Sequence, residues 1–418
     1  MEKIVIEGLT KLKGEVVVSG AKNAVLPIMA ACILNEEVNS FTNVPDLADV
    51  RTMIKLLKIL GAEVEFENGY LTINSKNIDK WEAPYDLVKT MRASVLVLGP
   101  LTARFKKSRV SLPGGCAIGE RPIDQHIKGL EILGAKTKLE EGYVETSVTV
   151  LRGGVIPFDV STVTGTENIM LSASISEGET VLLNAACEPE VVDLANVLIQ
   201  MGAKIEGAGT DIITINGVAK LNPVKNYEIM PDRIEAGTLM IAGALNESDL
   251  ILKNCKFEHV GTLAGKLIQA GVEVTRHNGS IRVKGSDKIN SIDLTTLPYP
   301  GFPTDMQAQM MTLMCLCRGM SIITETIFPQ RFMHTSELRR MGADIKLVGN
   351  SAVVRGVKEI SGAPIMASDL RASASLVLAG LGAKGKTEIL RAYHLDRGYE
   401  RLDKKLEAVG AKIWREQD

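Results

Sequence analysis

The sequence predicts an α/β fold of two domains, each built from three similar units of about 70 residues, with helices inside and sheets outside. A helical pattern, a glycine and an alternating strand recur six times, with the glycines 68 to 73 residues apart. Each repeat also holds a second helix that is apolar on nearly all sides, which is typical of a buried helix. The six glycines are Gly61, Gly134, Gly202, Gly271, Gly342 and Gly410.

The order of elements is the same in every repeat. The first copy predicts a helix over residues 50–60, a left-handed cap at Gly61 and a strand over 63–67. The last copy predicts a helix over 399–409 and a strand over 412–414. Glycine ends such helices because it adopts positive φ without steric cost.

The second helices, for example over residues 24–34 and 372–381, are rich in small and apolar side chains. Polar or charged residues precede them, and a helix N-terminus attracts anions. The period of the six repeats, about 70 residues, is too long for a solenoid, so three units per domain is the favoured arrangement. The pattern is interrupted near residues 220–232, and a cleft between two domains is expected. The residues at the helix starts are Lys22, Asn23, Arg92, Glu167, Asn168, Asp232, Arg233, Asp305, Asp369 and Arg371.

Composition narrows the possible partners. The 418 residues are 45% apolar and 23% charged, with a formal net charge of -2 and both signs interspersed. This pattern argues against nucleic-acid and membrane partners. No signal peptide or membrane-spanning run is visible, so a cytoplasmic protein is expected. The six cysteines and five histidines have no metal-ligand spacing, and neither a metal nor another cofactor is expected.

A glycine-rich segment over residues 112–122 contains one thiol, Cys116, five residues before Arg121. A nearby guanidinium can hold an anion and lower the pKa of a thiol. From the pattern alone, an inert cysteine in a tight turn is the commoner explanation of such a segment, and a reactive thiol is the alternative. Other loops that follow strands contain Glu188 and Glu190, Arg331, and Arg397.

Five motifs in a fixed order are similar to those of the enolpyruvyl transferases, and among these to the UDP-N-acetylglucosamine 1-carboxyvinyltransferases. The resemblance extends over the whole chain. It implies a two-domain inside-out α/β barrel, with one domain over residues 21–230 and the other over 1–20 and 231–418. The motifs are Ser19-Gly20-Ala21-Lys22-Asn23-Ala24, the Cys116 loop through Arg121-Pro122-Ile123-Asp124, Phe302-Pro303-Thr304-Asp305-Met306-Gln307-Ala308-Gln309, Asp369-Leu370-Arg371-Ala372-Ser373-Ala374 and Asp396-Arg397-Gly398-Tyr399.

The resemblance implies transfer of the enolpyruvyl group of phosphoenolpyruvate to the 3'-hydroxyl of UDP-N-acetylglucosamine, the first committed step of peptidoglycan synthesis. It places Lys22, Arg121 and Arg397 around phosphoenolpyruvate, whose two anionic groups suit guanidinium forks. Cys116 matches the family's proton donor, which can also form a covalent adduct and is the expected point of attack of fosfomycin. Asp305 matches the carboxylate that contacts the sugar hydroxyl, and is the best candidate for its base.

The remaining substrate-binding positions also follow from the resemblance. Asp124 is expected to hydrogen-bond the uracil, and Ile327 to contact the substrate through its backbone. Val160 departs from the family, many members of which have a lysine there, so one contact to the nucleotide phosphates is in question. For Asp232, Asp369 and Arg371, helix capping or a dipole contact is an equal alternative. The further positions expected to bind substrate are Asn23, Arg92, Arg121, Pro122, Ile123, Gln125, Arg331, Asp369 and Arg371.

Two other functions fit the same scaffold. A 5-enolpyruvylshikimate-3-phosphate synthase shares the repeats and phosphoenolpyruvate, although the Cys116 loop and the Lys22-Asn23 motif resemble it less well. A non-catalytic protein that binds a sugar nucleotide is the alternative of a different class. The sequence predicts no particular oligomeric state.

Overall fold

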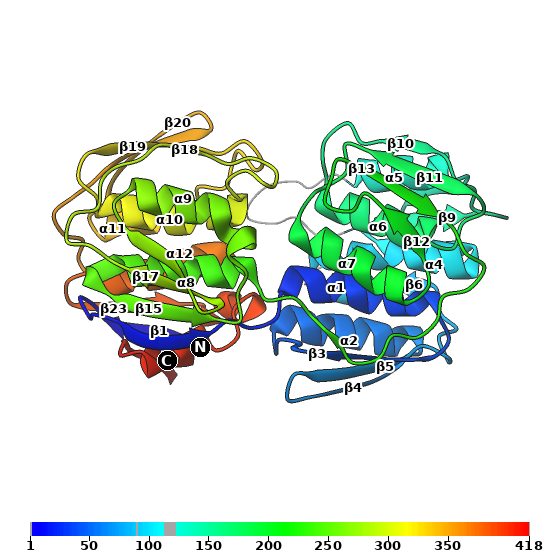
Figure 1. The fold of residues 1–418 in the computed structure, drawn as a ribbon, viewed down its shortest axis with the longest axis horizontal. Coiled ribbons are helices and arrows are strands. Elements are labelled where there is room, and N and C mark those ends of the chain that lie inside the picture. Colours follow the sequence, from blue (N-terminus) through cyan, green and yellow to red (C-terminus); the bar gives the residue numbers. More distant parts are fainter. Residues whose placement is uncertain (1, 89–90, 113–122, 418) are drawn as a thin grey trace. The chain divides into compact units, whose positions relative to one another are not determined.

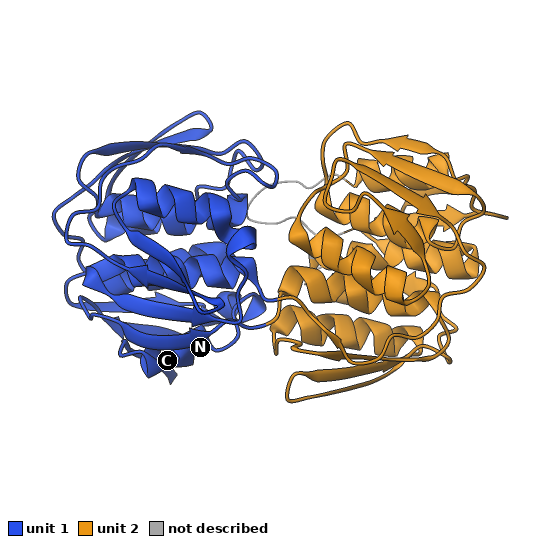
Figure 2. Ribbon diagram, in the orientation of Figure 1, with its two compact units in different colours: residues 1–19, 117–119, 231–418 blue, residues 20–116, 120–230 orange. Residues whose placement is uncertain are grey.

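A computed structural model describes residues 2–88, 91–112 and 123–417 of the chain (Figure 1). These residues form two compact units (Figure 2). Of the described residues, unit 1 contains those up to Ser19 and from Pro231 onward, and unit 2 contains those from Gly20 to Met230. No described helix is long and apolar enough to span a membrane.

In unit 2 each repeat supplies an inner helix, an outer helix and a hairpin. The helices are α1 (Lys22–Ala31), η1 (Cys32–Leu34), α2 (Ala48–Leu60), α3 (Tyr85–Val88), η2 (Arg92–Val97), α4 (Leu98–Phe105), α5 (Asp124–Ile132), α6 (Val163–Ala173) and α7 (Pro189–Gln200). The strands are β3 (Val38–Thr42), β4 (Glu63–Glu67), β5 (Tyr70–Asn74), β6 (Glu82–Ala83), β7 (Lys107–Ser111), β8 (Lys136–Glu140), β9 (Tyr143–Ser147), β10 (Val155–Pro157), β11 (Glu179–Leu183), β12 (Lys204–Glu206), β13 (Ile212–Asn216) and β14 (Tyr227–Glu228).

Unit 1 repeats the same plan. Its helices are α8 (Arg233–Ala244), η3 (Leu245–Glu247), η4 (Phe257–Val260), α9 (Gly261–Gln269), η5 (Thr304–Met306), α10 (Gln307–Cys315), α11 (His334–Arg340), α12 (Leu370–Gly382), η6 (Ala392–Arg397) and α13 (Leu402–Ala408). Its strands are β1 (Glu2–Glu7), β2 (Lys13–Val17), β15 (Asp249–Lys253), β16 (Glu273–His277), β17 (Ser280–Lys284), β18 (Leu294–Thr295), β19 (Met320–Thr324), β20 (Asp344–Val348), β21 (Ser351–Arg355), β22 (Pro364–Met366), β23 (Lys386–Leu390) and β24 (Lys412–Gln417).

The described strands form six four-stranded sheets of one topology, three in each unit. In each sheet an edge strand runs parallel to its neighbour, and the other two pairings are antiparallel, as in β6-β7-β9-β8. The six repeat glycines all have φ between +92° and +113°. The predicted α/β fold of six units with glycine-capped helices is therefore confirmed.

Three strands complete sheets from distant parts of the chain. β1 pairs antiparallel with both β23 and β24, so that Ile4 lies opposite Ile389 and Arg415. β2 pairs in parallel with β15. In unit 2, β14 pairs in parallel with β3 and closes the first sheet of that unit. The N-terminal segment is thus part of unit 1.

The core of each unit is built around its inner helices, which are α1, α4 and α6 in unit 2 and α8, α10 and α12 in unit 1 (Figure 1). The helix predicted over 372–381 is α12, and every residue from Arg371 to Gly382 is buried. The one predicted over 24–34 is α1 continued by η1. Small side chains allow this burial because they let neighbouring helices approach closely.

The predicted helix over 399–409 is wrong at its start. Helix α13 begins at Leu402, because Arg401 has a left-handed backbone with φ of 46°. Tyr399, which the pattern placed on this helix, is instead 1% exposed within the core of unit 1.

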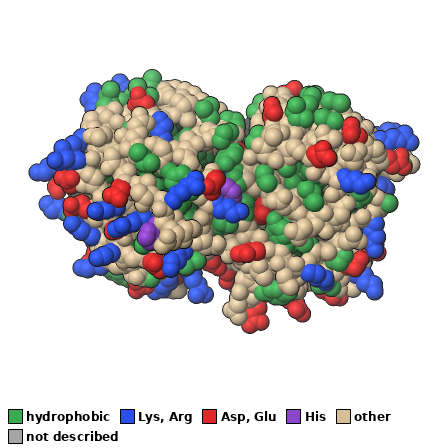
Figure 3. Space-filling model, in the orientation of Figure 1, with side chains coloured by type: hydrophobic (Ala, Val, Ile, Leu, Met, Phe, Trp, Pro, Cys, Tyr) green, Lys and Arg blue, Asp and Glu red, His purple; other side chains and the backbone are tan. Residues whose placement is uncertain are grey.

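On the face of each unit drawn in Figure 3, basic and acidic side chains lie interspersed.

Candidate active site

The centre of the candidate site in unit 1 is the carboxylate of Asp305. Arg331 donates from Nη1 to Oδ1 over 2.7 Å. Arg371 donates to Oδ2 from Nε and Nη2, over 3.1 Å and 2.8 Å. Three charge-assisted hydrogen bonds therefore fix both carboxylate oxygens, and the two from Arg371 converge on Oδ2.

These three residues come from separate elements. Asp305 lies in η5, the short turn that leads into α10. Arg371 stands in the first turn of the inner helix α12, and Arg331 precedes α11. The turn over 304–306 is held by Pro303, whose carbonyl accepts from the N–H of Met306 over 2.9 Å. The repeat brings together residues that are 26 and 66 positions apart in the chain.

Burial alone would raise the pKa of Asp305. The charge of Arg371, the charge of Arg331 and their hydrogen bonds outweigh it and hold this pKa well below the usual range. The Asp305 side chain is 24% exposed, while those of Arg331 and Arg371 are 6% and 2% exposed. Asp305 is thus an ionised carboxylate that can still be reached, fixed from behind by two buried cations.

Helix caps account for two of the predicted residues. Oδ1 of Asp369 accepts from the N–H groups of Arg371 and Ala372, over 2.9 Å and 3.0 Å, and so caps α12. Asp232 caps α8 in the same way. For Asp369 and Asp232 the capping alternative is therefore realised, and the cap of α12 also fixes the backbone from which Arg371 reaches Asp305.

A buried hydroxyl cluster lies behind Arg371, and the sequence interpretation gave it no role. The Tyr399 ring centre is 5.3 Å from the guanidinium carbon of Arg371. Its hydroxyl lies 3.0 Å from Oγ1 of Thr238 and accepts from Nε2 of Gln309 over 3.1 Å. The motifs that contain Tyr399 and Gln309 were the signal that could have identified this support. Arg397, from the same segment, is half-buried at the end of η6.

Unit 2 presents a second group at the start of its inner helix α1. Lys22 is 7% exposed, and its Nζ lies 3.3 Å from Oδ2 of Asp49. Asn23 follows it in the first turn and is half-buried. A lysine in a helix's first turn opposes the helix dipole, so the nearby Asp49 carboxylate helps to hold the charge there.

Two of the residues predicted to contact the nucleotide, Asp124 and Gln125, lie at the start of α5. Gln125 donates to Oδ2 of Asp124 over 3.0 Å and accepts from the N–H of Asp159 over 3.0 Å. Ile123 precedes the helix and is half-buried. Val160 is 68% exposed. Cys116, Arg121 and Pro122 lie outside the described residues, as does the side chain of Arg92.

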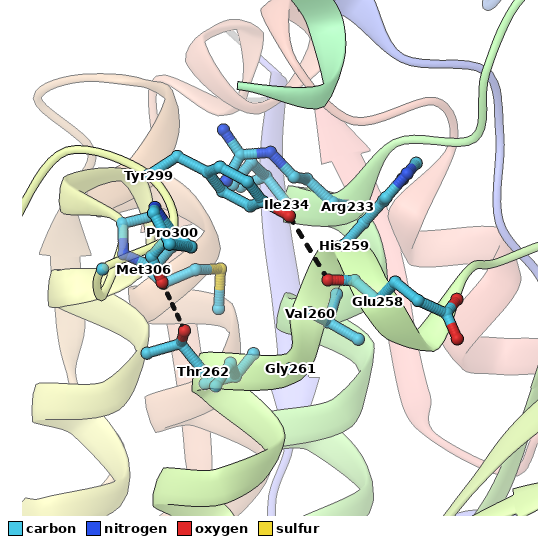
Figure 4. A pocket seen from close by; sticks show the side chains of 13 residues that line it. Arg233, Ile234, Glu258, His259, Val260, Gly261, Thr262, Tyr299, Pro300 and Met306 are labelled. Carbon is cyan, nitrogen blue, oxygen red and sulfur yellow. Dashed lines mark hydrogen bonds between the residues drawn. The ribbon is translucent and has the colours of Figure 1, made fainter. Parts of the chain in front are cut away.

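A separate cavity of about 220 Å³ lies beside the Asp305 turn, entirely within unit 1 (Figure 4). Its walls include Met306, Arg233, His259 and Tyr299, and Thr262 donates to the carbonyl of Pro300 across one side. None of the predicted site residues lines it. It is smaller than the cavities that enclose drug-sized ligands, so it cannot hold a whole sugar nucleotide. Among the described residues, no group of three His, Cys, Asp or Glu side chains could hold a metal ion.

A buried carboxyl in unit 2 predicts a dependence of stability on pH. Burial, with smaller contributions from Glu190 and Glu188, raises the pKa of Glu167 well above its usual value. The unfolded group titrates near about pH 4.3, so the ionised form weakens the fold as the pH rises above that value. Glu167→Gln is expected to raise the Tm more at pH 8 than at pH 5. At either pH, each kcal/mol gained in the free energy of unfolding should raise the Tm by about 3 °C. The exposed Glu179→Gln is the matched control, and an equal gain at both pH values would contradict the prediction.

The chain is similar in sequence and in fold to known enolpyruvyl transferases. The family model of EPSP synthase (3-phosphoshikimate 1-carboxyvinyltransferase) matches residues 6–406. The enolpyruvyl transferase NikO from Streptomyces tendae superposes with a TM-score of 0.89 at 24% identity, covering 99% of this chain and 98% of its own. EPSP synthase from Acinetobacter baumannii superposes at 0.78 with 19% identity over all of both chains. Fold and family model define a carboxyvinyl transferase.

Curated relatives narrow this class. A UDP-N-acetylglucosamine 1-carboxyvinyltransferase of Trichlorobacter lovleyi is 59% identical over 99% of both chains. Those of Geotalea daltonii and Myxococcus xanthus are 58% and 55% identical over the full length of both chains. The chain belongs to the UDP-N-acetylglucosamine 1-carboxyvinyltransferase family.

Proposed function

We propose that the protein transfers the enolpyruvyl group of phosphoenolpyruvate to the 3'-hydroxyl of UDP-N-acetylglucosamine and releases phosphate, as the first committed step of peptidoglycan synthesis. The observation that carries this proposal is the 55 to 59% identity, over nearly the whole chain, to relatives with that name. The proposal includes the cytoplasm as the compartment and Cys116 as the target of fosfomycin.

In this proposal the reaction is an addition followed by an elimination. The sugar 3'-oxygen forms a bond to C2 of phosphoenolpyruvate, and C3 gains a proton from Cys116. The C2–oxygen bond to phosphate then breaks while the Cys116 thiolate takes a proton back from C3, which restores the double bond. Lys22, Arg121 and Arg397 hold the phosphate and carboxylate, because guanidinium and ammonium groups stabilise the charge that the departing phosphate carries.

Asp305 receives a narrower role than that of a strong base. Its two guanidinium partners stabilise the carboxylate, and a carboxylate with a low pKa has little affinity for a proton. It remains a good hydrogen-bond acceptor. In the proposal it orients the 3'-hydroxyl toward C2 and takes up its proton only as the new C–O bond forms and the hydroxyl becomes more acidic.

Ile327 is proposed as a backbone contact to the sugar. Its N–H donates to Glu325 over 2.8 Å, so a backbone contact would use the carbonyl oxygen. Asp124 and Gln125, whose side chains touch each other at the start of α5, are proposed to contact the uracil and its surroundings.

The test measures phosphate release with both substrates. Release from phosphoenolpyruvate is expected only when UDP-N-acetylglucosamine is present. Shikimate 3-phosphate in its place is expected to give none, which separates this activity from that of the sister enzyme. Binding of the sugar nucleotide without phosphate release from the folded protein would overturn the proposal in favour of a non-catalytic role.

A further inference from the structure

We propose that Glu325 is a positioning residue that holds the loop carrying Ile327 and the turn carrying Asp305 in one arrangement, so that both meet the same sugar. This inference rests on the proposed function. Glu325 directly follows β19 and is completely buried. A buried carboxylate is costly unless it is well hydrogen-bonded, and four donors surround this one.

Three of the donors converge on one oxygen. Oε1 accepts from the N–H groups of Ile327 and Phe328, over 2.8 Å and 3.0 Å. It also accepts from Oγ1 of Thr296 over 2.7 Å. These bonds hold the loop after β19 in a tight turn, and they fix the direction of the backbone at Ile327.

The fourth donor leads to the Asp305 turn. Oε2 accepts from Oγ1 of Thr304 over 2.9 Å. The same hydroxyl accepts from Nη1 of Arg331 over 3.0 Å, and that nitrogen also donates to Asp305. A hydroxyl has one proton, and that of Thr304 is donated to Glu325, which leaves its oxygen to accept from Arg331. Glu325 therefore turns the Thr304 oxygen toward Arg331, which in turn holds Asp305.

A positioning role and a merely structural role of the Glu325 network predict different effects on the KM values of the two substrates. If the network only supported the fold, its loss would lower the Tm and the active fraction, and both substrates would keep their KM values. If it sets Asp305 and Ile327 against the sugar, its loss raises the KM for the sugar nucleotide alone, since no member of the network belongs to the proposed phosphoenolpyruvate site.

The experiment compares Thr304→Val with Thr304→Ser in the full-length protein. Valine removes the hydroxyl between Glu325 and Arg331, and serine restores it. Thr304→Val is expected to raise the KM for UDP-N-acetylglucosamine about tenfold, because a hydrogen bond to a charged group contributes roughly that factor or more. The KM for phosphoenolpyruvate should change less than about twofold, and Thr304→Ser should recover most of the loss.

Two further variants complete the design. Thr312→Val is the matched control, because it removes a buried hydroxyl that donates to the carbonyls of Ala308 and Ser375, outside the Glu325 network. Its KM values should equal those of the wild type. Glu325→Gln keeps the size but puts an amide donor where one accepting oxygen was, and it should raise the same KM. Unchanged KM values in both Thr304→Val and Glu325→Gln, with an active wild type, would overturn the positioning role alone. A wild type that releases no phosphate would overturn the proposed function itself.

Discussion

Asp305→Asn is expected to lower kcat for enolpyruvyl transfer by about a thousandfold, within the range of 10² to 10⁴ typical of groups that take part in proton transfer. The amide is neutral and cannot take up the proton of the 3'-hydroxyl. Its NH2 group would also face the donors of Arg331 or Arg371, so the side chain would turn or shift. The measurement is phosphate release at saturating concentrations of both substrates.

The matched control is Asp287→Asn, in which an exposed carboxylate of the same unit is neutralised. Its kcat should equal that of the wild type. Asp305→Asn also leaves Arg371, 2% exposed, without its anion, and breaking a buried pair is destabilising. The Tm of Asp305→Asn and of Asp287→Asn therefore has to be recorded. Their kcat values are then compared at a temperature below the lower of the two Tm values. A kcat within about threefold of the wild type would contradict the role of Asp305.

The ion pairs of Asp305 also determine the pH range in which this carboxylate stays ionised. The folded-state pKa of Asp305 is lowered, so its contribution to stability is present above the unfolded value of about 3.9 and is lost as the pH falls through the folded value. Asp305 therefore stays ionised from neutral pH down to about pH 4. Any fall in activity between pH 7 and pH 5 should arise from another group.

Cys116→Ala is expected to lower phosphate release at neutral pH by about a hundredfold or more, because it removes the proposed proton donor to C3. Cys116→Ser should be nearly as impaired, since a hydroxyl is a much weaker acid than a thiol. The epoxide fosfomycin should add its mass to the wild-type protein but not to either variant.

Cys187→Ala provides the matched control for this experiment. Cys187 is a free, half-buried thiol of unit 2 whose pKa is raised by burial and by the nearby carboxylates of Glu188 and Asp211. Its removal should leave both the rate and the fosfomycin adduct unchanged. Full activity in Cys116→Ala would mean that another acid protonates C3.

Much of the fold could be predicted because the repeat marks itself locally. A glycine such as Gly61 ends its helix through backbone conformation alone, and the apolar surface of α12 shows its burial directly in the sequence. The start of α13 could not be read in this way, because Tyr399 is drawn into the core by contacts with Thr238 and Gln309. Such contacts are non-local, and no helical period reveals them.

The candidate site divides along the same line. Asp305 and Arg371 were named from motifs and Arg331 from a loop that follows a strand, but their mutual hydrogen bonds depend on three elements of unit 1 that meet in the fold. Glu325 was missed entirely, since a glutamate after a strand usually points to solvent. Its complete burial was the decisive information, and only the packing around Thr296 and Thr304 supplies it.

The pairing of β1 with β23 and β24 has a consequence for the order of events during synthesis. Residues 20–230 contain every strand of the three sheets of unit 2, so this unit can assemble while the rest of the chain is still being made. The strand Glu2–Glu7 is translated long before β23 and β24, the two strands with which it pairs. Until these are made it is an unpaired strand, the kind of segment that joins foreign sheet edges and that chaperones cover.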